Sequence, residues 1–180
     1  MPTATDRDFL DMRVSDVRRI THDGQDHHVV VLQEPEGGRR LPIWIGHEHA
    51  LELALRLLGH GSQLARPLAS DLAARLVHAL GGSLREVRID RLTGGTYYAV
   101  IVVDSRQGTT EVDARPSDAL ALALVVGAPV RAVVDTSEFS EEVAQTLAAI
   151  DSQEAAGAQA LLDELATEAP RQDPPEPASS

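Results

Sequence analysis

The chain has 180 residues, of which 43% are hydrophobic, and a formal net charge of −12 at pH 7. It contains no cysteine and no lysine, which excludes disulfides, thiolate metal sites, a cysteine nucleophile, Schiff-base chemistry and a P-loop lysine. No apolar run approaches the roughly 20 residues of a membrane span, and the first residues lack the layout of a signal peptide. We therefore expect a cytoplasmic protein that has no membrane partner.

The negative charge is concentrated in the C-terminal part of the chain. Eleven of the 28 acidic residues lie from Ala132 onward against Arg171 alone, which leaves 17 acids and 15 arginines in residues 1–131. An acidic segment of this kind disfavours broad electrostatic binding of nucleic acid. It still allows a small phosphate site lined by arginine on the nearly neutral body of the protein.

Periodicity predicts strands followed by helices in the first half of the chain. Alternation predicts strands at residues 9–20, 28–33 and 41–45, and Leu10, Met12, Val14 and Ile20 are expected to share the inward face of the first strand. Leucines at helical spacing then predict helices at residues 47–58 and 70–80. The pair Gly81-Gly82 is expected to end the second helix.

The second half of the chain repeats this order of elements. Strands are predicted at residues 84–92, 96–104, 109–114 and 130–134, with a hairpin turn at Gly94-Gly95 and a helix at residues 116–126. One or two amphipathic helices are expected after Ser140. The end of the chain, PRQDPPEPASS, has the composition of a disordered segment.

Comparison of the two halves indicates an internal duplication. HHVVVLQEPEGGRRLPIWIGHEHALELAL and TYYAVIVVDSRQGTTEVDARPSDALALAL share their order of elements, and ALELAL and ALALAL lie 69 positions apart. The expected fold is mixed α/β (α+β), with a duplicated β-β-β-α-β-like motif, a largely antiparallel sheet and a C-terminal helical extension. The predicted domain covers residues 8–136, followed by an acidic amphipathic helical extension at 137–169 and a disordered tail at 170–180.

The stretch VDARPSD joins a predicted strand to a predicted helix and carries unusual polar chemistry. Pro116 suits the first helical turn, and Ser117 and Asp118 suit the unpaired amides and the dipole at a helix start. Asp113 and Arg115 precede the helix and need another explanation. Arg115 over a helix N-terminus would clamp a phosphate, or it would form a salt bridge with Asp113.

Two other predicted helix starts use the same residue types. One contains Arg66-Pro67 followed by Ser70-Asp71, and the other contains His47 and His49 in IGHEHA. The three starts would form one polar cluster if the fold brought them together. A metal site on His47 and His49 is a weak interpretation, because residues two apart on a helix point about 200° away from one another.

Three aromatic residues are candidates for contacts with a ligand. Trp44 suits packing in the core or an interface, or alternatively a platform for base stacking. Tyr97 and Tyr98 are adjacent on a predicted strand, so one should be buried and the other available for contacts.

Four separated motifs resemble the bifunctional nuclease family. They are LPIWIG before an Ala/Leu helix, RPL followed by DL, GTYYA, and DARPSDA, and the resemblance runs from about Met12 to Val134. It implies a compact mixed α/β fold with a duplicated motif, a homo-oligomer, with a dimer as the first expectation, and activity on RNA and DNA.

The chain departs from the family pattern at two places. Ala69 and Ser70 stand where the family usually has Thr and His, so a histidine that could act as general acid or base is missing. His49 stands where a glutamate is common. His47 and His49 are candidates to replace the missing histidine.

The leading prediction is a nuclease that hydrolyses phosphodiester bonds of RNA or DNA. Arg115 and a helix N-terminus would hold the phosphate, and a divalent metal, Mg²⁺ or Mn²⁺, would activate water. The predicted site consists of catalytic residues Arg115, Asp118, Asp113 and Asp71, substrate-binding residues Arg66, Ser117 and Tyr97, and metal ligands Asp113 and Asp118, with His47 as a weaker ligand.

Two alternatives remain open at the level of sequence. The first is a non-catalytic oligomeric module that binds a small anionic ligand or a protein partner, which the net charge and the missing histidine favour. The second makes the C-terminal helices an element for docking another protein.

Overall fold

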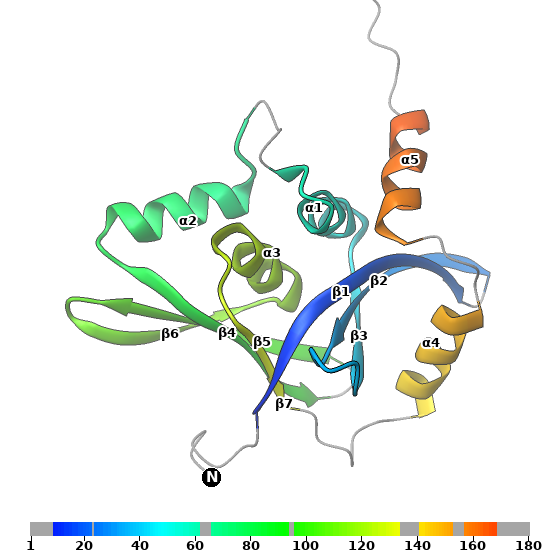
Figure 1. The fold of residues 1–180 in the computed structure, drawn as a ribbon, viewed down its shortest axis with the longest axis horizontal. Coiled ribbons are helices and arrows are strands. Elements are labelled where there is room, and N and C mark those ends of the chain that lie inside the picture. The colour runs from blue at the N-terminus through cyan, green and yellow to red at the C-terminus, as the bar shows by residue number, and fades with distance from the viewer. Residues whose placement is uncertain are drawn as a thin grey trace, which may run out of the picture.

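The computed structural model describes residues 9–22, 24–61, 66–93, 96–133, 141–152 and 157–168. Its elements, in chain order, are β1 (Phe9–His22), β2 (Gln25–Gln33), β3 (Arg40–Ile45), α1 (His47–Leu57), α2 (Ala69–Ala79), β4 (Ser83–Thr93), β5 (Thr96–Ser105), β6 (Gly108–Ala114), α3 (Pro116–Val126), β7 (Val130–Val133), α4 (Glu141–Ser152) and α5 (Ala158–Glu168). The strands form one bent sheet in the order β3-β2-β1-β7-β4-β5-β6 (Figure 1). The predicted elements are therefore confirmed, with shifts of a few residues at their ends.

The sheet consists of two similar halves. In each half three antiparallel strands lead into a helix: β1, β2 and β3 lead into α1, and β4, β5 and β6 lead into α3. β7 joins the halves, because it pairs antiparallel with β1 and parallel with β4. The mixed α/β class, the largely antiparallel sheet and the duplicated order of elements are confirmed. The closing strand follows α3, whereas α1 is followed by α2.

Two helix ends show why the helices begin and stop where they do. Pro116 occupies the first turn of α3, where its missing N–H breaks no intrahelical bond, and Arg115 is the N-cap residue. α3 ends at Gly127, whose φ of 70° is the left-handed conformation that glycine adopts without strain. α2 ends just before Gly81, which has a φ of 79°.

A bulge in β1 corrects the predicted inward face of that strand. Met12 and Val14 are buried as expected, but the register with β2 shifts between Val14 and Asp16. The extra residue reverses the alternation, so Val17 continues the face of Met12 and Val14. Ile20 is buried on the opposite face, which makes its assignment to the same face wrong.

Helices cover both faces of the first half of the sheet. The larger core cluster lies between the strands and α1, α3 and α5, and it includes Val30 and Leu32 of β2. Val29 and Val31 point to the other face, where they pack with Ile150 of α4. β2 is therefore apolar on both faces, which explains its uninterrupted VVVL sequence.

The C-terminal helices are attached to β1 and β3 by polar contacts. The guanidinium of Arg18 donates to the carbonyl of Ile150 at 2.9 Å, and the amide of Ala158 donates to Asp16 at 3.3 Å. Arg40 makes two hydrogen bonds of 2.7 Å to the carboxylate of Asp151. The described parts of the predicted extension are thus two helices that pack on the body.

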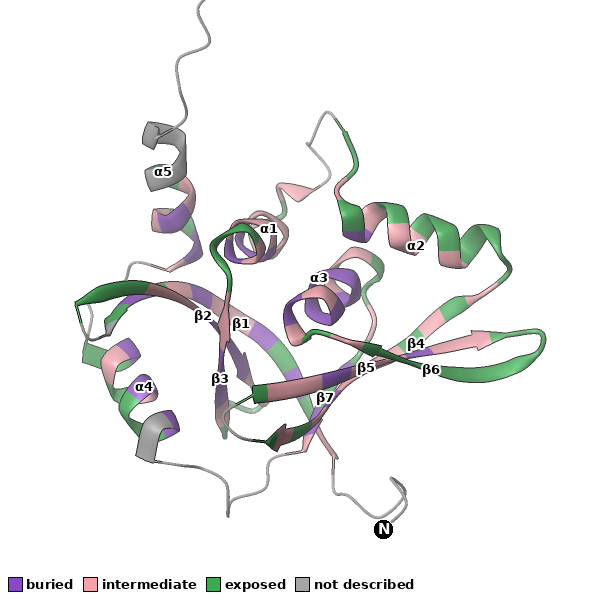
Figure 2. Cartoon of the chain, turned by 180° about the vertical axis from the view of Figure 1, so that it is seen from behind, coloured by how far each residue is buried: buried purple, intermediate pink, exposed green. Residues whose placement is uncertain are grey.

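The helices α2 and α3 differ in how much of their surface is exposed to solvent. Most of α3 is buried, whereas α2 is largely exposed on its outer side (Figure 2). Leu72, Leu76 and Leu80 are 53%, 53% and 86% exposed. Across the described ranges, no helix combines the length and the apolar character that crossing a membrane requires.

Candidate functional site

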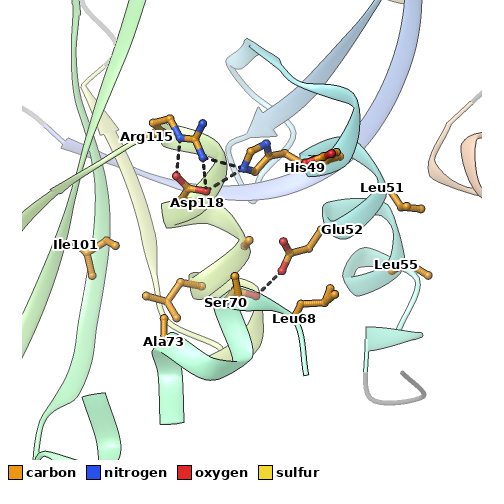
Figure 3. A pocket seen from close by; sticks show the side chains of 14 residues that line it. His49, Leu51, Glu52, Leu55, Leu68, Ser70, Ala73, Ile101, Arg115 and Asp118 are labelled. Atoms are coloured by element: carbon orange, nitrogen blue, oxygen red, sulfur yellow. Dashed lines mark hydrogen bonds and ion pairs between the residues drawn. The ribbon is translucent and has the colours of Figure 1, made fainter. Parts of the chain in front are cut away.

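A pocket of about 590 Å³ lies where the N-terminal parts of α1, α2 and α3 meet. Its wall also includes Ile101 of β5 (Figure 3). The helices contribute Glu48, His49, Leu51, Glu52 and Leu55 from α1, Leu68, Ala69, Ser70 and Ala73 from the start of α2, and Arg115, Asp118, Ala121 and Leu122 from α3. All three helix starts contribute to this pocket, but their polar residues form two clusters and not the single cluster that the sequence raised as a condition.

We call His49, Arg115 and Asp118 the outer cluster. Arg115 donates from Nε to Asp118 Oδ2 at 2.7 Å and from Nη2 to Oδ1 at 3.2 Å. His49 Nε2 lies 2.9 Å from Asp118 Oδ1 and 3.3 Å from Arg115 Nη2. An ionised carboxylate only accepts, so Nε2 carries a proton and donates to Asp118, and its approach to Arg115 is a contact between two donors.

The outer cluster follows from the internal duplication. His49 and Asp118 are 69 positions apart, which is the offset between ALELAL and ALALAL. They occupy equivalent positions on α1 and α3, and they meet because these two helices pack side by side at their N-terminal ends. One half of the repeat supplies the imidazole, and the other supplies the carboxylate and the guanidinium.

Electrostatics keep Asp118 and Arg115 of the outer cluster charged. Burial would raise the pKa of Asp118, but hydrogen bonds from Arg115 and His49 outweigh burial and hold that pKa below its usual value. The hydrogen bond to Asp118 raises the pKa of Arg115 in turn. The side chain of Arg115 is 71% exposed, so solvent and ligands can reach its guanidinium.

We call Glu52, Arg56, Ser70 and Asp71 the inner cluster, and it connects α1 to α2. The side chain of Arg56 is only 6% exposed and contacts both carboxylates at 3.0 Å. Arg56 also donates to Ser70 Oγ at 2.7 Å, and the Ser70 hydroxyl donates to Glu52 Oε1. Ser70, which stands where the family histidine is expected, therefore belongs to a structural network at the pocket wall.

Asp71 is occupied on both of its oxygens. Oδ1 and Oδ2 accept from Arg56, and Oδ2 also accepts the amide of Leu68, the N-cap residue of α2, at 2.9 Å. The hydrogen bond with Arg56 is the largest cause of a lowered pKa of Asp71. This carboxylate stabilises the start of α2 and the contact with α1.

A second hollow of about 410 Å³ lies beside the outer cluster. Tyr97 and Ser117, both predicted to contact substrate, line it together with His49 and Arg115. Ser117 is 7% exposed. Arg115 and His49 therefore stand between two hollows, and the structure brings Tyr97 and Ser117 to the second of them.

The aromatic residues separate into packing and surface roles. Trp44 packs against the cluster on the α4 side of the sheet, and its ring meets that of His27 edge to face at 5.1 Å. Trp44 therefore contributes to packing, which is one of the two roles considered for it from the sequence. Tyr98 lies under the guanidinium of Arg91 at 4.3 Å, whereas Tyr97 packs toward the main core, so the two tyrosines do face opposite ways.

Four predicted site residues, Asp71, Asp113, Arg66 and His47, are absent from the lining of both hollows. Asp113 is exposed on β6, and Arg66 is exposed ahead of α2. Within the described residues the ion pair of Arg115 is with Asp118, so the alternative salt bridge to Asp113 does not form. His47 Nδ1 lies 3.3 Å from His28 Nε2, whereas His49 contacts Asp118, so the two α1 histidines have different partners.

The predicted metal ligands are not assembled into one group. Among the residues that the structure describes, no set of three His, Cys, Asp or Glu side chains has the arrangement of a metal site. Asp71 is bound to Arg56, and both oxygens of Asp118 are bound in the outer cluster. These residues therefore do not fit a preformed divalent-metal site.

The sequence did not predict the contacts of three residues in the two clusters, His49, Glu52 and Arg56. His49 was considered as a possible replacement for the absent histidine, but its contact with Asp118 was not predicted. Its position in the repeat was the available signal, because it is equivalent to Asp118. Glu52 and Arg56 have the i, i+4 spacing of a helical ion pair. The spacing alone does not predict that α2 packs over the Glu52–Arg56 pair and shields it from solvent.

Comparison of the sequence with known families agrees with the mixed α/β fold. The profile of the bifunctional nuclease domain matches residues 30–143, and the chain belongs to this family.

The chain is also similar to two proteins of Mycobacterium tuberculosis. They are the uncharacterized protein MT1877 of strain CDC 1551 / Oshkosh and the uncharacterized protein Rv1829 of strain ATCC 25618 / H37Rv. Each is 46% identical over 106 residues, which cover 59% of this chain and 62% of the relative. The match therefore spans less than two thirds of the length of these relatives.

Proposed function

We propose that the protein hydrolyses phosphodiester bonds of RNA or DNA at the outer cluster. The observation that carries the proposal is an exposed arginine held by Asp118 where the starts of α1 and α3 meet, beside a pocket that the start of α2 also lines, in a chain of the bifunctional nuclease family. Helix N-termini present unpaired amides and partial positive charge, and an arginine adds directed donors for phosphate oxygens.

Arg115 has the geometry to bind a phosphate without leaving Asp118. Its contacts within the described residues use Nε and Nη2, which leaves Nη1 for an incoming oxygen. Asp118 fixes the guanidinium plane, so the arginine is oriented before substrate arrives. Preorganised charge of this kind stabilises the negative charge that develops on a phosphorane-like transition state.

His49 is the proposed proton acceptor, in place of the family histidine that Ser70 replaces. Its Nε2 donates to Asp118, which orients the ring and leaves Nδ1 to accept a proton. In the proposed reaction the oxygen of water attacks phosphorus, and His49 takes the proton released by that water. The bond from phosphorus to the leaving oxygen breaks, and that oxygen takes a proton from solvent.

Assistance by Mg²⁺ or Mn²⁺ remains part of the proposal and is supported by charge. Glu48, Glu52 and Asp118 line the pocket with Arg115, and the charge of Glu52 is offset by Arg56. Asp118 is paired with Arg115, so Glu48 is the lining acid whose charge no arginine offsets within the described residues. A divalent cation supplied with the substrate would offset its repulsion of a polyanion.

The test is cleavage of single-stranded RNA and double-stranded DNA with Mg²⁺, with Mn²⁺ and with chelator. Wild type is compared with Arg115→Ala and Asp118→Asn, all purified identically. We expect a loss of at least about 100-fold in Arg115→Ala, the usual cost of removing a donor to a transition-state oxyanion.

Arg106→Ala is the matched control, because Arg106 is an exposed arginine in the turn between β5 and β6. It should cleave at the wild-type rate. Equal cleavage by wild type and Arg115→Ala would remove Arg115 from the site. Cleavage that survives in both site variants would indicate a contaminating nuclease.

A non-catalytic module that binds a small anion is the second candidate, and one observation favours it. Ser70 cannot transfer a proton near neutral pH, and its hydroxyl is committed to the inner cluster. Binding of phosphate that depends on Arg115, without cleavage under any metal condition, is the result that this candidate predicts.

Three further proposals concern the context of the protein. Nucleic acid is the proposed partner, and a homo-oligomer, first of all a dimer, is the proposed assembly, which sedimentation equilibrium would measure. A cytoplasmic location is the third proposal.

A further inference from the structure

The pocket beside Arg115 contains more than a phosphate needs. A phosphate site requires charge and amides, but this pocket has about 590 Å³ of space, within the range of small-molecule sites. Much of its lining is apolar and includes Leu51, Leu55, Leu68, Ile101 and Leu122. The pocket therefore suits a ligand with a flat apolar body and polar groups at two ends.

We propose that this pocket accepts one unstacked nucleobase of a single-stranded nucleic acid, whose phosphate lies on Arg115. This inference rests on the proposed function for the phosphate subsite. Apolar walls on both sides replace the stacking that the base loses when it leaves its neighbours. A base in a duplex would first have to be extruded, so single strands should be preferred to duplexes.

Glu52 supplies the polar end that a base requires. It projects from α1 toward the space between Asp118 and Ser70 (Figure 3). Its hydrogen bonds to Arg56 and Ser70 all use Oε1, and Oε2 has no hydrogen-bond partner within the described residues. The side chain is 17% exposed, so this oxygen is an acceptor at the wall of an otherwise apolar space.

The chemistry of that acceptor selects the kind of base. A carboxylate accepts from the exocyclic amine of cytosine, whereas uracil presents a carbonyl oxygen at the same position. The carboxylate would repel that oxygen and would leave it without a donor. The pocket should therefore prefer cytosine to uracil, although the two bases have nearly the same shape.

An acyl chain with an anionic head is the competing occupant of an apolar pocket. It would match the leucines, but it would offer no donor to Glu52 Oε2 and would leave that charged oxygen against hydrocarbon. A buried polar group without a partner costs free energy, and a charged one costs more. The acidic wall thus favours a base over a chain.

The test measures binding of CMP, UMP, inorganic phosphate and decyl phosphate to the full chain by isothermal titration calorimetry. CMP should bind about tenfold more tightly than UMP, the discrimination of one base-edge contact. Both nucleotides should bind more tightly than inorganic phosphate.

Ala73→Phe should remove the advantage of CMP over phosphate, because Ala73 lines the pocket and the larger ring would fill it. Ala79→Phe is the matched control, since Ala79 is exposed at the other end of α2 and does not line the pocket. Urea unfolding of both variants establishes that they remain folded. Ala73→Leu, a smaller filling change, takes the place of Ala73→Phe if that variant does not fold.

Several results would overturn the inference. They are equal binding of CMP, UMP and phosphate, unchanged CMP binding in the folded filling variant, or decyl phosphate binding that exceeds CMP. Each leaves the proposed nuclease intact if cleavage still depends on Arg115. Conversely, selective CMP binding without cleavage would end the nuclease proposal and retain the base pocket.

Discussion

The outer and inner clusters are each built around an arginine paired with carboxylate, and they use that arginine in opposite ways. Arg56 is 6% exposed and is surrounded by two carboxylates and a hydroxyl, whereas Arg115 is 71% exposed and pairs with one carboxylate. A buried arginine whose donors are all matched has none left for a ligand. An exposed arginine that uses only Nε and Nη2 in contacts with the protein still has Nη1 available to donate to a phosphate. Burial and the number of partners therefore separate structural from functional arginines here.

The strongest test of this comparison is Arg56→Met, which keeps the volume of the side chain but removes its charge. Glu52 and Asp71 would lose their common partner inside the α1–α2 contact. We expect the free energy of unfolding to fall by about 3 kcal/mol, the lower end for a broken buried pair, because both acids retain some exposure. Urea denaturation measures this change.

Arg115→Ala provides the contrast for that measurement, since its exposed guanidinium should contribute little to the free energy of unfolding. Arg106→Ala, at an exposed arginine in the turn between β5 and β6, is the matched structural control. Equal destabilisation by Arg56→Met and Arg115→Ala would contradict the division into inner and outer clusters.

A smaller effect is expected from Asp71→Asn, and it should depend on pH. The folded-state pKa of Asp71 lies below its ordinary value of 3.8 because of the hydrogen bond with Arg56. Its charge therefore stabilises the fold above the ordinary pKa, and this contribution is lost as pH falls through the lowered folded pKa. At pH 7 the variant should be about 2 kcal/mol less stable than wild type, and the gap should close below about pH 4.

Urea unfolding of wild type and Asp71→Asn at pH 7, 5, 4 and 3 measures how the difference in their free energies of unfolding decreases. Asp118→Asn should show the same direction with a smaller amplitude, because its carboxylate is 44% exposed and more strongly screened. Glu36→Gln, at an exposed acidic residue in the turn between β2 and β3, is the matched control variant. A gap between wild type and Asp71→Asn that widens toward acid pH would reverse the assigned pKa direction.

The smallest effect concerns Ser70→Ala, which removes one hydroxyl from the inner cluster. Arg56 would lose one acceptor and Glu52 one donor, so we expect a loss of about 1 kcal/mol in the free energy of unfolding. Thermal unfolding followed by circular dichroism measures it. No change in stability would mean that the Ser70 hydroxyl does not contribute to the α1–α2 contact.

Local pattern was sufficient to predict most of the fold. The strands and helices, the stop at Gly81 and the duplicated order follow from apolar periodicity and turn residues, which act over a few positions. The inward face of β1 failed after Val14, because a single bulged residue reverses the alternation without a clear mark in the sequence. The candidate site was predicted only in part for a related reason. Local motifs in the sequence identify Arg115, Asp118, Ser117 and Tyr97. The roles of Glu52 and Arg56 depend on the residues of α2 that pack against them, which no local motif indicates.

The sequence by itself determined the class of fold, the family and the presence of an arginine and an aspartate at a helix start. Each of these depends on residues that are neighbours along the chain or on a motif of a few positions. Only the tertiary structure decided that His49 meets Asp118, that Asp113 does not pair with Arg115, and that Arg56 is enclosed. These outcomes depend on how α1, α2 and α3 pack, because packing sets which charges lose water and which keep it.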